Sequence, residues 1–155
     1  MLELDVQREV AGLPTDEELF TWVNETLEFV THTDAELTIR FVNEKEIAEL
    51  NEQYRNKSGP TNILSFPFEV PAELDGEVEL NLLGDLIICS DVVKKEAEQQ
   101  NKSEIAHWAH MLVHGTLHLL GYDHLTDVDA DVMETKEIQI LSKLGYSDPY
   151  REIEP

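Results

Sequence analysis

The sequence is poor in cysteine and lacks long apolar runs, and these two absences exclude several classes of protein. Among 155 residues there is a single cysteine, Cys89, so no disulfide can form within the chain. No apolar run approaches the roughly 20 residues that a transmembrane helix needs, and the amino terminus has none of the features of a signal peptide. We therefore expect a soluble, cytoplasmic protein of a reducing compartment that does not act at a membrane.

Positive charge is also scarce. The chain has 33 acidic and 11 basic residues, which gives a formal net charge of -22. This balance favours solubility and opposes non-specific binding to nucleic acid, whose backbone is itself negative. A nucleic-acid substrate would have to be captured by a bound metal and by a local group of basic residues, for which the candidates are Arg40, Lys45, Arg55 and Lys57.

The length, with 41% hydrophobic and 28% charged residues, is ordinary for one globular domain, which we expect to span 1–155. Apolar and polar patterning predicts strands near 2–6, 37–41, 62–68 and 82–89. Strands separated by helices are expected to be parallel, and the last two, joined without a helix, antiparallel. The predicted fold class is α+β: one domain with a small, mixed, mostly parallel four-stranded sheet and helices packed on it.

Local signals refine this prediction. Pro67 predicts a sheet edge or a bulge, because proline cannot donate a ladder hydrogen bond, and Gly84-Asp85 predicts a turn that interrupts the last strand. Capping signals predict that helices begin at five places, namely Thr15, Asn43, Ser90 or Asp91, Ser103 and Thr126.

The stretch 114–124 carries the strongest chemical signal. His114 and His118 are four residues apart, so on a helix their imidazoles point toward one place. Gly121 tolerates positive φ and predicts a helix end, after which the chain returns His124 to the same place. Three neutral imidazoles with an open fourth position form a known catalytic zinc arrangement. We predict one zinc ion per chain, or another divalent metal, at the end of this core helix; the alternative is a structural histidine cluster.

Other residues near this stretch have a less specific signal. His107 lies about 16 Å along the helix axis from His118, too far to share its metal. His110, one turn before His114, could contact substrate or orient a ligand, or could be a hydrogen-bonded helix histidine with no such role. Asp123 could hold a metal-binding histidine in place through a hydrogen bond, or could serve only the turn.

The spacing H-x-x-x-H-x-x-G-x-x-H is that of the metzincin proteases, but their glutamate after the first histidine is replaced here by Gly115. That glutamate is the general base, so a metalloprotease or amidohydrolase with this site would lack its proton acceptor. A second alternative is a non-catalytic ribosome-assembly factor with a structural zinc and an acidic surface for basic ribosomal proteins. Structural zinc normally has four protein ligands, and no cysteine or fourth histidine stands in register.

Taken together, His114-Gly115 and the residues up to Gly121-Tyr122-Asp123-His124 closely resemble the signature of the YbeY family of bacterial metal-dependent endoribonucleases. The similarity extends over nearly the whole chain. It includes Tyr54-Arg55, the run at 60–68, the Leu83-Gly84-Asp85 segment and the run at 106–111.

The resemblance implies cleavage of single-stranded RNA in the cytoplasm, processing of the 3′ end of 16S ribosomal RNA and ribosome quality control, with the ribosome or ribosomal proteins as partners. It also implies that His114, His118 and His124 bind zinc and that Arg55 is the functional arginine of the substrate cleft. Asp85 and His110 are further candidate substrate contacts. Arg55 and His114 are the predicted catalytic residues.

Such a site needs no glutamate base. Zinc held by three neutral histidines lowers the pKa of bound water to about 7 and so supplies a hydroxide. The guanidinium of Arg55 is always charged and is suited to gripping a phosphate as negative charge builds on it; a surface salt bridge is its alternative role. The sequence leaves open whether water or the ribose 2′-hydroxyl attacks.

Overall fold

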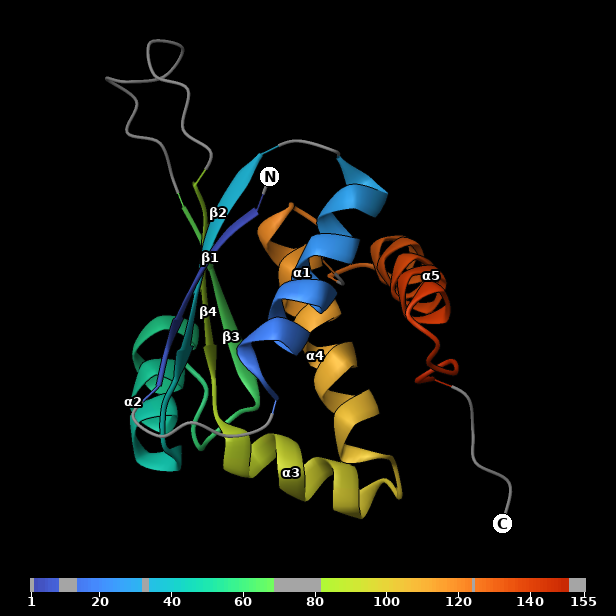
Figure 1. Ribbon diagram of the computed structural model, residues 1–155. Coiled ribbons are helices and arrows are strands. Elements are labelled where there is room, and N and C mark those ends of the chain that lie inside the picture. Colours follow the sequence, from blue (N-terminus) through green and yellow to red (C-terminus); the bar gives the residue numbers. More distant parts are fainter. Residues whose placement is uncertain (1, 9–13, 32–33, 69–81, 124, 151–155) are drawn as a thin grey trace, which may run out of the picture.

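The computed structural model describes residues 2–8, 14–31, 34–68, 82–123 and 125–150. Figure 1 shows a sheet with helices on both of its faces. Along the chain the elements are β1 (Leu2–Gln7), α1 (Asp16–Val30), β2 (Ala35–Phe41), α2 (Glu44–Arg55), β3 (Ile63–Pro67), β4 (Leu82–Ile88), α3 (Ser90–Gln99), α4 (Glu104–Leu119) and α5 (Asp127–Lys143).

The sheet is mixed and mostly parallel, as predicted. Its strand order is β1-β2-β4-β3, in which β2 pairs parallel with both β1 and β4. The strands β3 and β4 pair antiparallel, from Ile63 opposite Ile88 to Pro67 opposite Gly84. The prediction that Pro67 marks a sheet edge is confirmed, because β3 is the outermost strand on its side among the strands that the structure describes.

The turn predicted at Gly84-Asp85 is wrong, because both residues lie inside β4. Gly84 pairs with Leu37 and Asp85 with Thr38 of β2, and the irregularity is a register shift between Glu36 and Leu37. Gly84 has φ +142°, and a Cβ there would lie 2.1 Å from the carbonyl oxygen of Phe66. The glycine therefore permits a close approach between β4 and β3.

Two apolar clusters lie on the two faces of the sheet. On the face that we call the inner face, Ile39, Leu86 and Ile88 pack with side chains of α1, α4 and α5. On the opposite, outer face, Ile87 and Leu64 pack with Ile47 of α2. Figure 1 agrees, with α1, α4 and α5 on one side of the strands and α2 on the other. The helix α4, which carries the histidines, is thus buried between sheet and helices.

Most helix starts were readable from local sequence. The side chains of Thr15, Asn43, Ser103 and Thr126 each accept a hydrogen bond from the backbone N–H three residues later. The prediction that Ser90 or Asp91 caps α3 is wrong. Cys89 holds the cap position without a side-chain bond, and its N–H donates to the Asn62 carbonyl, so the chain passes directly from sheet to helix. No helix in the described residues is long and apolar enough to span a membrane.

Candidate metal centre

The histidines of α4 form one stripe, as the spacing predicts. Successive ring centroids are 6.3 Å apart for His107 and His110, 6.2 Å for His110 and His114, and 4.8 Å for His114 and His118. The first two side chains are buried and the last two are partly exposed. The closest ring pair therefore lies at the end of the helix that solvent reaches.

The helix end at Gly121 is also confirmed. The N–H groups of Leu120 and Gly121 bond back to the carbonyls of Thr116 and His118, and Gly121 has φ +101°. Most residues pay a steric cost at that φ, and glycine does not. His124 lies outside the described residues, so its return toward His114 and His118 stays a prediction.

His114 has a buried carboxylate as its neighbour. Its Nδ1 lies 2.5 Å from Oε1 of Glu137 on α5, whose exposed fraction is 0%. The Tyr150 hydroxyl donates a hydrogen bond to Oε2 of the same carboxylate. His110 Nε2 lies 3.3 Å from the Tyr150 hydroxyl oxygen and 3.5 Å from Glu137 Oε2. His110, His114 and Glu137 together form a group that could hold a metal ion.

Burial and hydrogen bonds together determine the protonation states of Glu137 and Tyr150. Burial alone would raise the pKa of Glu137, but hydrogen bonds from His110, His114 and Tyr150 lower that pKa to about 2. Burial, and then the hydrogen bond to Glu137, raises the pKa of Tyr150 far above its usual range. At neutral pH the carboxylate is therefore ionised, and the tyrosine keeps the proton that it donates.

Sequence reasoning missed Glu137 and Tyr150. A signal for Glu137 existed, because it lies four residues after Met133 and four before Leu141 on the buried stripe of α5. A carboxylate at such a position needs buried partners. Tyr150 follows the last helix in a polar tail, and no local pattern points to it.

His107, which its spacing excluded from the predicted metal site, has a different partner. Its Nε2 lies 3.1 Å from Oε1 of Glu96 on α3, and the Asn62 amide donates to the same carboxylate at 2.9 Å. Burial raises the pKa of Glu96, but the hydrogen bonds to His107 and Asn62 outweigh it and lower the pKa overall. This contact joins α3, α4 and the start of β3.

Gly115 faces the sheet. A Cβ on Gly115 would lie 2.7 Å from Ile63 Cδ1 and 2.9 Å from Leu86 Cδ2, closer than carbon atoms normally approach. The position at which a metzincin carries its glutamate is therefore occupied by the contact between α4 and the sheet. A longer side chain here would have to displace two core residues.

Arg55 ends α2 beside the edge strand. Its Nη2 lies 3.4 Å from the Ser65 carbonyl oxygen, and the Ser65 hydroxyl lies 3.5 Å from the Gly115 carbonyl oxygen. Two hydrogen bonds through β3 thus connect Arg55 to the residue after His114. Within the described part of the chain Arg55 has no carboxylate partner, whereas Arg40 pairs with Glu46 at 2.5 Å. The surface salt bridge considered for Arg55 is not found there.

The remaining two candidates lie in different surroundings. Asp85 is exposed on the outer face, because its neighbour Leu86 faces α4. Asp123 accepts a hydrogen bond from the Leu125 N–H at 3.2 Å, which is a local turn contact. The structure does not bring Asp85 to the histidine stripe, and the predicted roles of both residues stay predictions.

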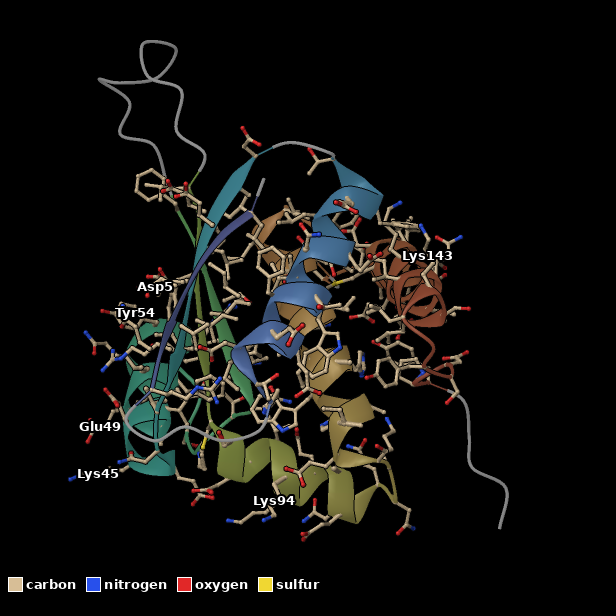
Figure 2. The ribbon with its side chains drawn as sticks, in the orientation of Figure 1. Asp5, Lys45, Glu49, Tyr54, Lys94 and Lys143 are labelled. Atoms are coloured by element: carbon tan, nitrogen blue, oxygen red, sulfur yellow. The ribbon has the colours of Figure 1, made fainter. Side chains whose placement is uncertain are left out.

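The outer face around Asp85 is acidic. It contains an open hollow of about 770 Å³ whose lining includes Glu3, Asp5, Glu36 and Asp85. The side chains of Glu3 and Glu36, on paired strands, share a hydrogen bond, and this bond and their mutual repulsion raise the pKa of Glu36. Figure 2 shows Asp5 on the same side of the sheet as Tyr54 of α2. This face repels a phosphate backbone.

Comparison with known proteins places the chain in a family. The family model described as Endoribonuclease YbeY matches residues 5–145. The Endoribonuclease YbeY of Colwellia psychrerythraea is 54% identical over 155 residues, which cover 98% of this chain and 97% of that protein. The solution structure of TM1509 from Thermotoga maritima has a TM-score of 0.58 and 25% identity, covering 97% of this chain and 99% of that one. The chain therefore belongs to the YbeY family of endoribonucleases.

Proposed function

We propose that the chain, as a single catalytic domain, is a metal-dependent endoribonuclease that cleaves single-stranded RNA. We further propose that it acts in the cytoplasm on ribosomal RNA, in maturation of the 16S 3′ end and in ribosome quality control. The metal ligands are His114, His118 and His124, and the metal is zinc. Family membership supports the reaction class, and the histidine pair at the end of α4 supports the metal site.

The observation that carries this proposal is the geometry of His114 and His118. Their rings are 4.8 Å apart on the solvent-reached end of α4, where the helix stops at Gly121. Since His114 Nδ1 is engaged by Glu137 at 2.5 Å, its Nε2 remains as the metal donor. Two imidazoles presented together on a rigid helix fit the nitrogen-rich donor set that zinc accepts.

Each residue then has a defined task. His114, His118 and His124 would hold the divalent metal, which would supply Lewis acidity and would lower the pKa of the attacking hydroxyl, whether it comes from water or from the ribose 2′ position. Arg55, without a carboxylate partner in the described residues, is available to grip the phosphate and to stabilise the charge that develops on it. The hydrogen bonds through Ser65 set Arg55 relative to the end of α4.

The packing of Gly115 favours a nuclease over a protease or amidohydrolase. A glutamate base has no room at this position, because a Cβ would already contact Ile63 and Leu86. Cleavage of a phosphodiester instead requires a cation next to the negative phosphate oxygens, and Arg55 supplies that cation.

The acidic outer face supports ribosomal proteins as partners. Glu3, Asp5, Glu36 and Asp85 repel RNA but attract the basic surfaces of proteins that bind RNA. On this assignment RNA lies at the β3 edge of the sheet, between Arg55 and the end of α4, and the partner approaches the acidic hollow of the outer face.

The test is cleavage of single-stranded RNA, double-stranded RNA and casein by the purified protein, with and without chelator. Chelator-sensitive cleavage of the single strand alone is expected. Metal analysis of His114→Ala and His118→Ala should show loss of the ion, while His107→Gln, changed on the same helix, should retain it. Casein cleavage, or full metal content in both alanine variants, would overturn the proposal.

A further inference from the structure

Glu137 is a fully buried carboxylate on an apolar helix face. Its exposed fraction is 0%, and Met133, Ile140 and Leu141 of the same face are buried in the core. A carboxylate placed in such surroundings destabilises the fold unless its oxygens are hydrogen-bonded. A buried carboxylate at this position therefore indicates a role that an apolar residue could not have.

Both oxygens of Glu137 are used, and the partners come from separate parts of the chain. Oε1 meets His114 Nδ1 of α4 at 2.5 Å. Oε2 accepts from the hydroxyl of Tyr150, beyond α5, and lies 3.5 Å from His110 Nε2. The carboxylate is thereby held on one side by Tyr150 and His110 and presented to His114 on the other.

The distance between Glu137 and His114 is that of a hydrogen bond and not of two ligands on one ion. Two ligand atoms on tetrahedral zinc, each about 2.0–2.2 Å from it, lie about 3.3–3.5 Å apart. A separation of 2.5 Å leaves no room for an ion between Nδ1 and Oε1. The two atoms are in direct hydrogen-bond contact, at a separation below the roughly 2.7–2.9 Å that is usual for an N–H group and a charged oxygen acceptor.

We propose that Glu137 is a positioning residue for His114. Its carboxylate, anchored by Tyr150, holds His114 in the tautomer with the proton on Nδ1 and fixes the ring, so that Nε2 is directed to a divalent metal before any ion is present. This inference deepens the proposed function and rests on it, because it takes His114 as a metal ligand. A carboxylate bonded to the second nitrogen of a ligating histidine typically strengthens metal binding by about 10–100-fold.

Metal affinity provides the first test. Zn²⁺ affinity, measured by competition with a chromogenic chelator, should fall by about 10–100-fold in Glu137→Gln and by less in Tyr150→Phe, which removes the anchor alone. The matched control is Glu134→Gln, which removes the same charge from the same helix and from a cavity of about 320 Å³ that His114 and Glu137 also line. That control should stay within about threefold of wild type. Equal affinities for wild type and Glu137→Gln would overturn the inference.

The tautomer provides a test that does not depend on a folded variant. In the metal-free wild-type protein, ¹H–¹⁵N correlation of the imidazoles should show a proton on His114 Nδ1, and the signal should persist after Zn²⁺ is added. A proton on Nε2 in the metal-free protein would overturn the inference. Loss of the Nδ1 proton on loading would also overturn it, because Glu137 and Nδ1 would then both be ligands.

The same measurements separate this inference from the proposed function. If His114→Ala keeps the ion, the metal assignment itself fails. If His114→Ala loses the ion but Glu137→Gln binds it with wild-type affinity, the assignment stands and only the role of Glu137 falls.

Discussion

At the scale of single residues, the end of α4 is shaped by what each position touches. His114 meets the buried carboxylate of Glu137, while the next residue, Gly115, lies against Ile63 and Leu86 of the sheet. One position of the helix therefore belongs to the proposed metal centre, and its neighbour contributes to the packing of the core. This division explains why a protease-like spacing of histidines is combined with a glycine.

Replacement of Gly115 by alanine tests this packing. In an open helix position the change stabilises a protein by about 1 kcal/mol, because alanine has the higher helix propensity. Here we expect Gly115→Ala to destabilise by about 1–3 kcal/mol through overpacking. Ile63→Val removes the nearest atom, so the double variant should recover part of the loss. Chemical denaturation measures both, and a stabilised Gly115→Ala variant would show that the contact is not close.

Replacement of Arg55 tests whether its charge stabilises the transition state of RNA cleavage. A cation that stabilises charge appearing in the transition state should lower kcat more than it raises KM when it is removed. Arg55→Ala is expected to lose on the order of 10²–10³ in RNA cleavage rate, and Arg55→Lys to recover part, since lysine keeps the charge without the planar fork. Zinc content should not change in either variant.

The control for Arg55 is Arg40→Ala. Arg40 was a candidate for RNA capture, but its ion pair with Glu46 at 2.5 Å offsets its charge, so we expect it to contribute little. The cleavage rate of Arg40→Ala should remain close to wild type. A wild-type single-turnover rate for Arg55→Ala would remove Arg55 from the site.

At the scale of elements, what could be predicted from the sequence was local. Thr15, Asn43, Ser103 and Thr126 cap helices through bonds to residues three positions away, and alternation within a strand needs no distant partner. The strand directions followed from whether a helix intervened. The Gly84 segment was misassigned because a glycine is required there by the close approach of Phe66 on another strand. No local sequence pattern indicates that contact.

The candidate site divides in the same way. His114 and His118 were found because a helix brings residues four apart together, and the observed rings are neighbours. Glu137 was missed because it reaches His114 across helix packing, 23 residues away in the sequence. Tyr150 was missed because it reaches Glu137 and His110 from the tail that follows α5. His107 was separated from the metal by its position on the helix, but its partner Glu96 was not predicted.

Glu96 gives a prediction at this scale, because its carboxylate joins α3 to α4 and β3. The folded pKa is lower than the unfolded one, so the contact stabilises the fold above the usual glutamate pKa of about 4.5. The stabilisation is lost as the pH falls below that value, through the folded pKa. Glu96→Gln should cost about 1 kcal/mol at neutral pH and show a smaller loss of stability on acidification.

The control for this prediction is Glu98→Gln, an exposed carboxylate on the same helix. It should leave both the neutral-pH stability and its fall in acid close to wild type. Equal acid sensitivity of wild type and Glu96→Gln, measured by thermal unfolding between neutral and acidic pH, would mean that the contact does not contribute.

At the scale of the whole molecule, the protein and its RNA substrate both carry negative charge. The formal net charge is -22, and the outer face of the sheet collects carboxylates from β1, β2 and β4. An RNA strand is therefore repelled at long range and held by few cations at short range. The arrangement of the sheet resolves this conflict in part, since α4 with its histidines lies on the inner face, away from the acidic hollow.

Salt dependence of RNA cleavage tests this balance. Each phosphate that a cation neutralises on a single strand contributes a slope of roughly −0.7 in log affinity against log salt. Two contacts, for example from Arg55 and Lys57, would thus lose about sevenfold between about 50 and about 200 mM salt. Over the same range salt screens the repulsion between RNA and the acidic protein, which raises the association rate. We therefore expect kcat/KM for single-stranded RNA, at constant metal concentration, to fall by less than about sevenfold or to rise. A fall of more than about a hundredfold would require five or so phosphate contacts, and RNA would then be bound through a basic surface that this distribution of charge does not provide.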